Sequence, residues 1–195
     1  MRKLLIDLDR TLFDTTLFVQ TLWDWIEQTY GVNAESSRHG MKQYFTYVGE
    51  MYNYDFFKHI ADLGIDGNDL TRRAQAELAG LFIFDDVAEF LGTTRDLDRA
   101  ILTFGADNYQ QFKISLCPEL KGLDVYMTQG FKHEYITEHW PDQPTLLIDD
   151  RLLEPALPSV TQFVLIDRAQ TSHVVEHGNY RSINSLVAFH EKWLQ

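Results

Sequence analysis

Short apolar segments, each followed by a polar residue, recur along this chain. They cover residues 4–6, 100–102, 124–127, 146–148 and 163–166. Segments this short and this apolar, rich in branched side chains, are typical of strands that are buried on both faces of a sheet. Such strands occur in parallel sheets with helices on both faces, so the pattern predicts one sheet of this kind.

Stretches long enough for a helix separate the later strands. They occupy 106–116, 132–139 and 151–157, and an amphipathic helix is predicted over 184–194. Strands that alternate with helices indicate βαβ units and a parallel sheet. We therefore predict an α/β protein whose core is a doubly wound, Rossmann-like sheet.

The alternation is interrupted between the first and second strands, where the chain is far longer than a βα connection requires. Helical spacing of apolar residues predicts several helices in this insert. They cover 16–30, 37–48, 55–63 and 69–82. The sequence thus predicts a helical cap over 14–86, inserted into an α/β catalytic core that is formed by 1–13 and 87–195.

The charge and the cysteine content narrow the range of partners. The 195 residues carry a formal net charge of −12 and include one cysteine, Cys117, so no internal disulfide and no cysteine-built metal site is expected. The negative charge would repel DNA or RNA along a broad surface, and we do not expect a nucleic acid as partner. A small phosphorylated metabolite remains compatible with the negative net charge, because a cation and one or two basic side chains in the site can outweigh the field of more distant acidic residues.

The apolar segments are too short for a membrane protein. None approaches the ~20 residues that a transmembrane helix needs. The first one, 4–6, is also shorter than the roughly 7–15 residues in the apolar region of a signal peptide. We therefore expect a cytoplasmic protein that does not use a membrane as partner.

Polar side chains follow the predicted strands at the point where each strand ends. In a doubly wound sheet the carboxyl ends of neighbouring strands open onto one crevice, so these side chains should meet. They are Asp7, Asp9, Thr103, Lys132, Asp149 and Asp150. Clustered carboxylates repel one another unless a cation is present, and oxygen ligands of this kind suit Mg²⁺. A metal ion and a lysine would neutralise a phosphoryl group, and a neighbouring carboxylate can act as nucleophile.

The order of these residues resembles the four motifs of the haloacid dehalogenase-like (HAD) hydrolase superfamily. Asp7–Thr11, after an apolar strand, is similar to its first motif, Asp-x-Asp-x-Thr. Residues 101–103 resemble the second motif, a strand that ends in Thr or Ser. Lys132, 17 positions before Asp149, resembles the third, and 146–150 the fourth, a strand that ends in an acidic pair. The insert resembles the helical cap of the family's first cap class.

The resemblance implies a phosphatase with two catalytic aspartates. Asp7 would be the nucleophile and a metal ligand. Asp9 would be the general acid and base, and its backbone carbonyl would bind the metal. The dehalogenases of the superfamily resemble this pattern without the second aspartate, so the presence of Asp9 favours phosphoryl transfer over cleavage of a carbon–halogen bond.

The resemblance also implies the binding groups. Thr103 and Lys132 would hold the phosphoryl oxygens, and Lys132 would screen the charge of the nucleophile. Asp149 would bind Mg²⁺ through its carboxylate, and Asp150 would bind it through water or orient the other ligands. The substrate would be a small phosphate monoester, and the reaction would pass through an aspartyl phosphate.

The chain departs from the family pattern at two places, and two other functions stay open. Arg10 stands where the pattern often has Gly, and Phe104 follows Thr103 where it often has Asn. A phosphomutase would share the first step and return the phosphoryl group to another hydroxyl. A non-catalytic module that binds phosphate or metal could keep the same fold.

Overall fold

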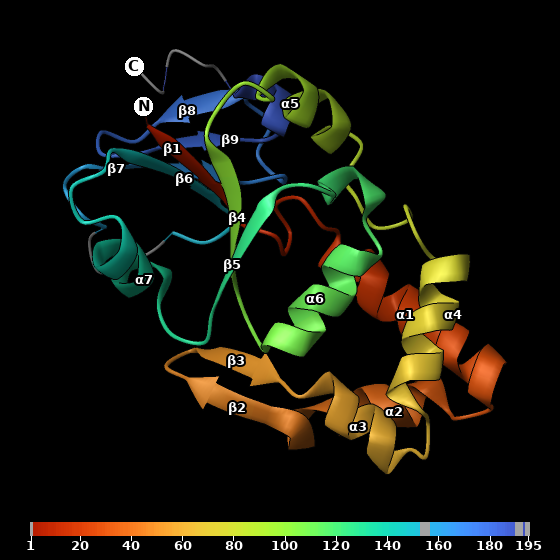
Figure 1. Cartoon of the computed structure of the whole chain (residues 1–195). Helices are drawn as coiled ribbons and strands as arrows, with labels where there is room; N and C mark the ends of the chain where they lie inside the picture. Colours follow the sequence, from red (N-terminus) through yellow and green to blue (C-terminus); the bar gives the residue numbers. More distant parts are fainter. Residues whose placement is uncertain (1, 153–156, 190–192, 194–195) are drawn as a thin grey trace.

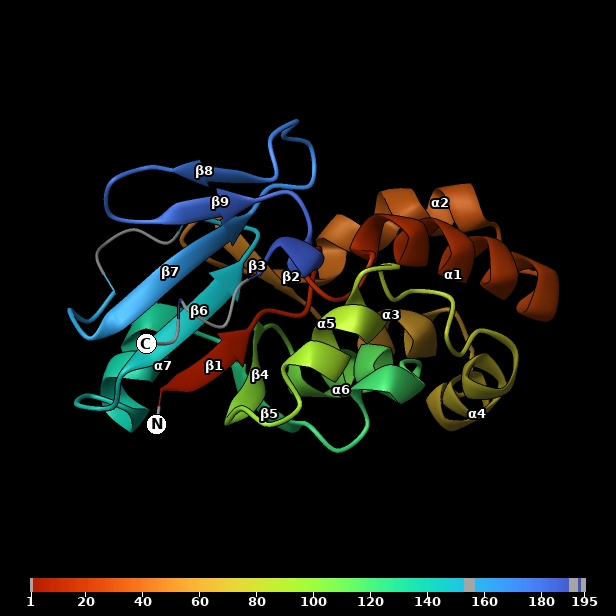
Figure 2. The ribbon, with the colours of Figure 1, turned by 90° about the horizontal axis from the view of Figure 1, so that it is seen from above.

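A computed structural model describes residues 2–152, 157–189 and 193. Its centre is a seven-stranded sheet in which all neighbouring strands are parallel except the last pair (Figures 1 and 2). In order across the sheet the strands are β5 (Asp124–Thr128), β4 (Arg99–Phe104), β1 (Lys3–Ile6), β6 (Thr145–Asp149), β7 (Thr161–Ile166), β9 (Arg181–Ile183) and β8 (Val174–Glu176). The five predicted strands are confirmed, and the predicted α/β fold with them.

Successive residues of the central strands face opposite sides of the sheet and enter two hydrophobic clusters. Leu4 and Ile6 belong to the large cluster, which also contains side chains of α5 (Val87–Thr93) and α6 (Asp107–Ser115). Leu5 belongs to a smaller cluster that is covered by α7 (Lys132–His139). The strands are therefore buried on both faces, as their continuous apolar sequence predicts.

The insert between β1 and β4 is mostly helical, as predicted, but it also contains a β-hairpin. Its elements are α1 (Thr15–Tyr30), α2 (Ala34–Gly40), a 3₁₀ turn η1 (Met41–Tyr44), β2 (Phe45–Val48), β3 (Met51–Tyr54), α3 (Phe56–Asp62) and α4 (Gly67–Glu77). The predicted helix over 37–48 is wrong beyond Gly40. The strands β2 and β3 pair across a two-residue turn, and Gly49, with φ of 60°, takes the first turn position as tight hairpins require.

Aromatic side chains join the insert to the sheet layer. The ring of Phe56 in α3 stacks on Phe112 of α6, with 5.5 Å between centroids. Phe18 of α1 packs against Tyr109 and Phe112 of the same helix, at 6.2 Å from each ring. One continuous hydrophobic cluster therefore fills the insert and covers one face of the sheet. The division of the chain into a cap over 14–86 and a core stays a prediction.

Two predicted helices near the end of the chain are not seen as such. The helix over 151–157 falls largely on 153–156, which lie outside the described residues. Of the helix over 184–194, the described part forms a 3₁₀ turn, η3 (Leu186–Ala188), and the rest lies mostly outside the described residues. The strands β8 and β9 were not predicted, because three residues are too few for a periodic pattern to appear.

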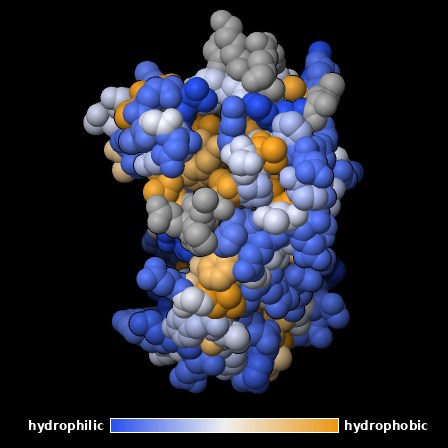
Figure 3. Space-filling model, turned by 90° about the vertical axis from the view of Figure 1, so that its left-hand side faces the viewer, coloured by the Kyte–Doolittle hydropathy of each residue, from blue (hydrophilic) through white to orange (hydrophobic). Residues whose placement is uncertain are grey.

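Figure 3 shows that hydrophilic side chains cover most of the face that carries α7 and β7, with smaller hydrophobic areas between them. Among the described residues, no helix combines the length and the apolar character needed to span a bilayer.

Candidate active site

The carboxyl ends of β1 and β6 bring three aspartates together. The two strands are parallel neighbours with Ile6 opposite Ile148, so Asp7 lies beside Asp149, the last residue of β6. One carboxylate oxygen from each of Asp7, Asp149 and Asp150 lies within 4.8 Å of the other two. Asp7 and Asp149 are buried, whereas Asp150 is partly exposed.

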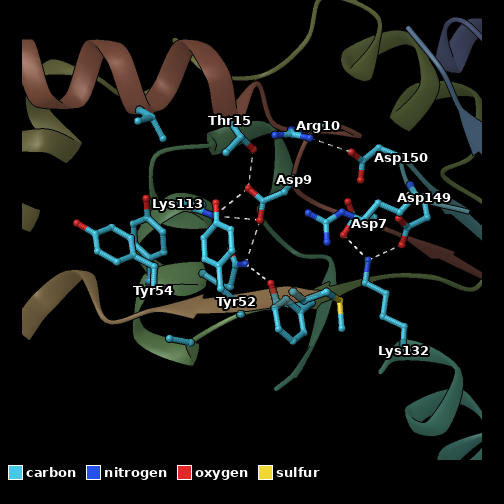
Figure 4. A pocket seen from close by; sticks show the side chains of 18 of the residues that line it. Asp7, Asp9, Arg10, Thr15, Tyr52, Tyr54, Lys113, Lys132, Asp149 and Asp150 are labelled. Atoms are coloured by element: carbon cyan, nitrogen blue, oxygen red, sulfur yellow. Dashed lines mark hydrogen bonds and ion pairs between the residues drawn. The ribbon is translucent and has the colours of Figure 1, made fainter. Parts of the chain in front are cut away.

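Lys132, the first residue of α7, places its ammonium group between two of these carboxylates (Figure 4). Its Nζ donates a hydrogen bond to Asp7 Oδ1 and another, at 2.6 Å, to Asp149 Oδ2. Burial opposes the charge of this lysine, but Asp149 and Asp7 outweigh burial and raise the pKa of Lys132. The side chain is therefore a fixed cation beside the predicted nucleophile.

Asp7 and Asp149 share this one ammonium group, whereas the third carboxylate, Asp150, lies nearer to Arg10 and Arg151. Burial raises the pKa of Asp7, and although Lys132 lowers it, the neighbouring carboxylates keep it well above its usual value. Burial, and then the charge of Asp149, raise the pKa of Asp150 to about 6. A divalent cation would relieve this repulsion.

The acidic cluster has the donor chemistry of a magnesium site. Mg²⁺ prefers carboxylate oxygens and keeps several of its waters, so two or three converging carboxylates suffice. The backbone N–H of Arg151 donates to Asp149 Oδ1 at 2.9 Å and fixes the orientation of that carboxylate. The residues present therefore fit the ion that the sequence predicts.

Asp9 lies beside this cluster but has a different set of partners. Lys113 Nζ donates to both of its oxygens, at 2.8 and 2.9 Å. Thr15 Oγ1 donates to Oδ1 at 2.6 Å, and Gln110 Nε2 donates to Oδ2 at 3.0 Å. Burial alone would raise the pKa of Asp9, but Lys113, with Thr15 and Gln110, lowers it below the usual carboxyl value. This carboxylate is held ionised and in one orientation.

Sequence reasoning missed Lys113 and Gln110, which are both buried on α6. They lie three positions apart, on the face of the predicted helix that also carries buried Tyr109, and this shared face was the available signal. Gly105, just before the helix, has φ of 147°, and a Cβ there would lie 2.4 Å from Gln110 Nε2. The absence of a side chain at this position is what gives Gln110 access to Asp9.

Thr103, predicted to hold phosphoryl oxygens, lies in β4 and is fully buried. Its Oγ1 has no hydrogen-bond partner among the described residues. The segment that follows it, 104–106, lines the cavity at this point. The cavity does gather the other predicted site residues, which are Asp7, Asp9, Lys132, Asp149 and Asp150.

Arg10 adopts a left-handed backbone conformation with φ of 61°, which explains why Gly is frequent at this position of the motif. Its side chain is largely exposed, and Nη1 lies 3.9 Å from Asp150 Oδ2. An ion pair this long and this exposed contributes little to stability. It adds positive charge to the mouth of the cavity.

The cavity has a volume of about 160 Å³ and two chemically different ends. The acidic cluster and Lys132 form one end. Tyr52 and Tyr54 of the insert mark the other end: in Figure 4 they lie on the far side of Asp9 from Asp7. Tyr109 of α6 contacts the ring of Tyr54 and lies at the same end. Over the whole cavity, the apolar and aromatic lining residues are Val19, Met41, Met51, Tyr52, Tyr54, Phe104, Ala106, Tyr109 and Phe131.

No protein-family model matches the sequence, and no curated protein matches it. Solved structures do match the fold over nearly the whole chain. A haloacid dehalogenase-like hydrolase from Burkholderia xenovorans is 16% identical, with a TM-score of 0.66 over 99% of this chain and 98% of that one. A HAD phosphatase from Thermococcus onnurineus is 19% identical, with a TM-score of 0.61 over 100% and 98%.

A third structure of this fold was solved with magnesium. It is a HAD hydrolase from Bacillus subtilis that is 16% identical, with a TM-score of 0.58 over 95% of both chains. An L-2-haloacid dehalogenase from Xanthobacter autotrophicus also matches, at 18% identity and a TM-score of 0.51 over 88% of this chain and 79% of that one. At these identities the likeness shows the fold alone: the chain has the fold of the HAD-like hydrolases.

Proposed function

We propose that this protein is a Mg²⁺-dependent phosphohydrolase that cleaves small phosphate monoesters with Asp7 as nucleophile. The observation that carries the proposal is the buried cluster of Asp7, Asp149 and Asp150 around Lys132 at one end of a cavity. The fold supports it, since structures of this fold include a HAD phosphatase and a HAD hydrolase bound to magnesium.

In the first step, an oxygen of the Asp7 carboxylate attacks phosphorus and displaces the alcohol, which leaves an aspartyl phosphate. Lys132 stabilises negative charge on the phosphoryl oxygens, because it is fixed in place before the substrate arrives. The hydroxyl of Thr103, which has no partner among the described residues, would provide a further donor to these oxygens.

In the second step, water attacks the aspartyl phosphate and releases phosphate and free Asp7. Asp9 takes the proton of this water, and the donors around its carboxylate keep it ionised in the free protein for this task. In the first step the leaving oxygen needs a proton. The monoanion of a phosphate monoester, whose second pKa is about 6, can supply it, and Asp9 passes it from the phosphoryl group to the leaving oxygen.

Asp7, Asp149 and Asp150, with the backbone carbonyl of Asp9, would hold Mg²⁺. The bound ion would supply charge neutralisation at the transferring phosphoryl group. Because three carboxylates converge beside one buried lysine, the same ion would also stabilise the folded protein.

The test compares phosphate release by the wild type and by Asp7→Asn, with 4-nitrophenyl phosphate as substrate and with either Mg²⁺ or EDTA. We expect activity that requires Mg²⁺ and falls at least about 10³-fold in Asp7→Asn, as is usual when a nucleophile is removed. Asp142→Asn, at an exposed position, is the matched control. Activity that persists in Asp7→Asn would contradict the mechanism. Release of chloride from 2-chloropropionate, without phosphatase activity, would favour a dehalogenase instead.

A further inference from the structure

The end of the cavity away from Asp7 is built from aromatic rings that hold one another in place. Tyr52, on β3, stacks on Phe45 of β2, with 4.0 Å between ring centroids and 13° between planes. Tyr54 meets Tyr109 edge to face at 5.2 Å, and its hydroxyl is bonded to His59 Nδ1 at 2.7 Å. This wall is therefore preorganised, and what it presents to a ligand is mainly ring surface.

The cations that line the cavity lie beside carboxylates. Lys113 is paired with Asp9, and its side chain is only 4% exposed. Arg10 and Arg151 are close enough to Asp150 to lower its pKa, which places them at the acidic end. Around the aromatic rings, the described residues thus offer no unpaired cation for a second phosphate or a carboxylate.

The order of groups along the cavity suits a phosphate group joined to one flat ring. A phosphoryl group at Asp7 directs its leaving oxygen toward Asp9, and the tyrosines lie beyond Asp9 in the same cavity (Figure 4). A sugar would bring several hydroxyl groups that need hydrogen-bond partners, and an apolar wall leaves such groups unsatisfied. A nucleoside diphosphate or a bisphosphate would bring charge that nothing at this end neutralises.

We infer that the substrates of this site are phosphate monoesters of aromatic alcohols, with the ring of the leaving group held against Tyr52 and Tyr54. This inference rests on the proposed function, because it places the phosphoryl group at Asp7. Tyr52 is then a specificity-determining residue that the hairpin of the insert supplies. It is 47% exposed without a ligand, so a bound ring would cover surface that is now in contact with water.

The experiment compares benzyl phosphate with ethyl phosphate. Both esters release a primary alcohol, so the comparison isolates the ring from the reactivity of the leaving group. We expect kcat/KM to be about 10- to 100-fold higher for benzyl phosphate, the factor that burial of one aromatic ring provides. Cyclohexylmethyl phosphate, of similar size but not flat, should be several-fold poorer than the benzyl ester.

Tyr52→Ala should lower the benzyl-to-ethyl ratio of kcat/KM by about five- to tenfold, through a higher KM for the benzyl ester. The matched control is Tyr180→Ala. Tyr180 is partly exposed, lies between β8 and β9 and does not line the cavity. The ratio should stay within twofold of the wild type in this control.

A binding measurement separates failure of this inference from failure of the proposed function. Benzylphosphonate and ethylphosphonate cannot be hydrolysed, and their affinities for the wild type in Mg²⁺ can be compared by calorimetry. Tighter binding of benzylphosphonate without hydrolysis of any ester would overturn the proposed function and keep the aromatic site. Equal affinities, equal kcat/KM for the esters, or a cyclohexylmethyl ester as good as the benzyl ester would each overturn the inference.

Discussion

The cavity contains two clusters in which a buried lysine meets carboxylate, and they differ in their balance of charge. Around Lys132, the carboxylates of Asp7 and Asp149 share one ammonium group, and a third carboxylate, Asp150, has an oxygen within 4.8 Å of theirs. Around Asp9, one carboxylate accepts hydrogen bonds from Lys113, Thr15 and Gln110. Accordingly the pKa of Asp7 is raised, whereas the pKa of Asp9 is lowered.

The difference shows which cluster is complete within the chain. The Asp9 cluster satisfies its own carboxylate with donors from α1 and α6. The Asp7 cluster has more negative charge than its lysine can neutralise, and is the one where an added cation would lower the energy. Stability measurements can therefore distinguish the two clusters, and the following predictions run from the largest expected effect to the smallest.

Lys113→Met should cause the largest loss of stability. The substitution leaves the Asp9 carboxylate, whose side chain is 27% exposed, without its cation. Breaking a fully buried pair costs about 3–5 kcal/mol, so we expect a loss near the lower end of this range. Urea unfolding would measure the change in free energy. Lys121→Met, at an exposed position, is the matched control and should change it by less than about 0.5 kcal/mol.

A double-mutant cycle tests whether this loss arises from the Asp9 charge. Because Asn carries no charge, Asp9→Asn combined with Lys113→Met should be clearly more stable than the sum of the two single effects predicts. Purely additive effects would mean that Lys113 contributes through the packing of its side chain, for instance over the ring of Tyr109, 4.4 Å from its Nζ. The difference in charge balance between the Asp7 and Asp9 clusters would then not account for the loss of stability.

The two clusters also differ in how far the sequence could predict them. Asp7 and Asp149 directly follow apolar strands, and in a parallel sheet the ends of such strands meet, so their encounter follows from periodicity and topology. Lys113 and Gln110 are two of several polar residues within α6. Their meeting with Asp9 depends on the rotation of α6 against the sheet, which side-chain packing decides.

The same distinction holds for the fold. The central strands were predicted because both their faces are apolar, whereas β2 was missed because the insert reads as helical between 37 and 48. β3 lies in the short stretch between this predicted helix and the next, over 55–63. The aromatic side chains of β2 and β3 alternate with other residues, and the register places Phe45, Tyr47, Tyr52 and Tyr54 on one face of the hairpin. This alternation with a period of two was the available signal for the tyrosines of the cavity wall.

The Asp7 cluster should make the metal-free protein less stable as the pH rises. The pKa of Asp150 is about 6 in the folded protein against an ordinary value of 3.8, so the folded state binds more protons between these pH values than the unfolded state. The free energy of unfolding in EDTA should thus decrease by up to about 3 kcal/mol between pH 4 and pH 7. Excess Mg²⁺ should abolish most of this decrease.

Asp150→Asn identifies the source of the pH dependence. This variant should lose the part of the decrease in EDTA that Asp150 contributes and keep the part that Asp7 contributes, whereas Asp142→Asn should keep all of it, because Asp142 is exposed and lies outside the cluster. Asp9, whose pKa is lowered, makes the opposite contribution. The stability that it gives to the folded protein is lost only as the pH falls through its folded pKa. A stability that is constant or rises across this range in EDTA would contradict the excess of negative charge.

The smallest effect is expected at Thr103, and its sign is informative. The hydroxyl is fully buried and has no partner among the described residues, so Thr103→Val should leave the protein equally stable or up to about 1 kcal/mol more stable. The matched control is Thr145→Val, where the hydroxyl, also buried in a strand, is bonded to Thr161 Oγ1 at 2.7 Å. Its loss should destabilise the protein by about 1 kcal/mol.

Activity decides why an unsatisfied hydroxyl is kept at the end of β4. If Thr103 donates to a phosphoryl oxygen, Thr103→Val should lower kcat/KM by about tenfold, the value of one hydrogen bond to a charged group, while stability is unchanged or improved. Thr145→Val should show the reverse, with stability lost and kcat/KM retained. A Thr103→Val enzyme with full activity would mean that Lys132 binds the phosphoryl group without a hydrogen bond from Thr103. The buried hydroxyl of Thr103 would then have no role in the site.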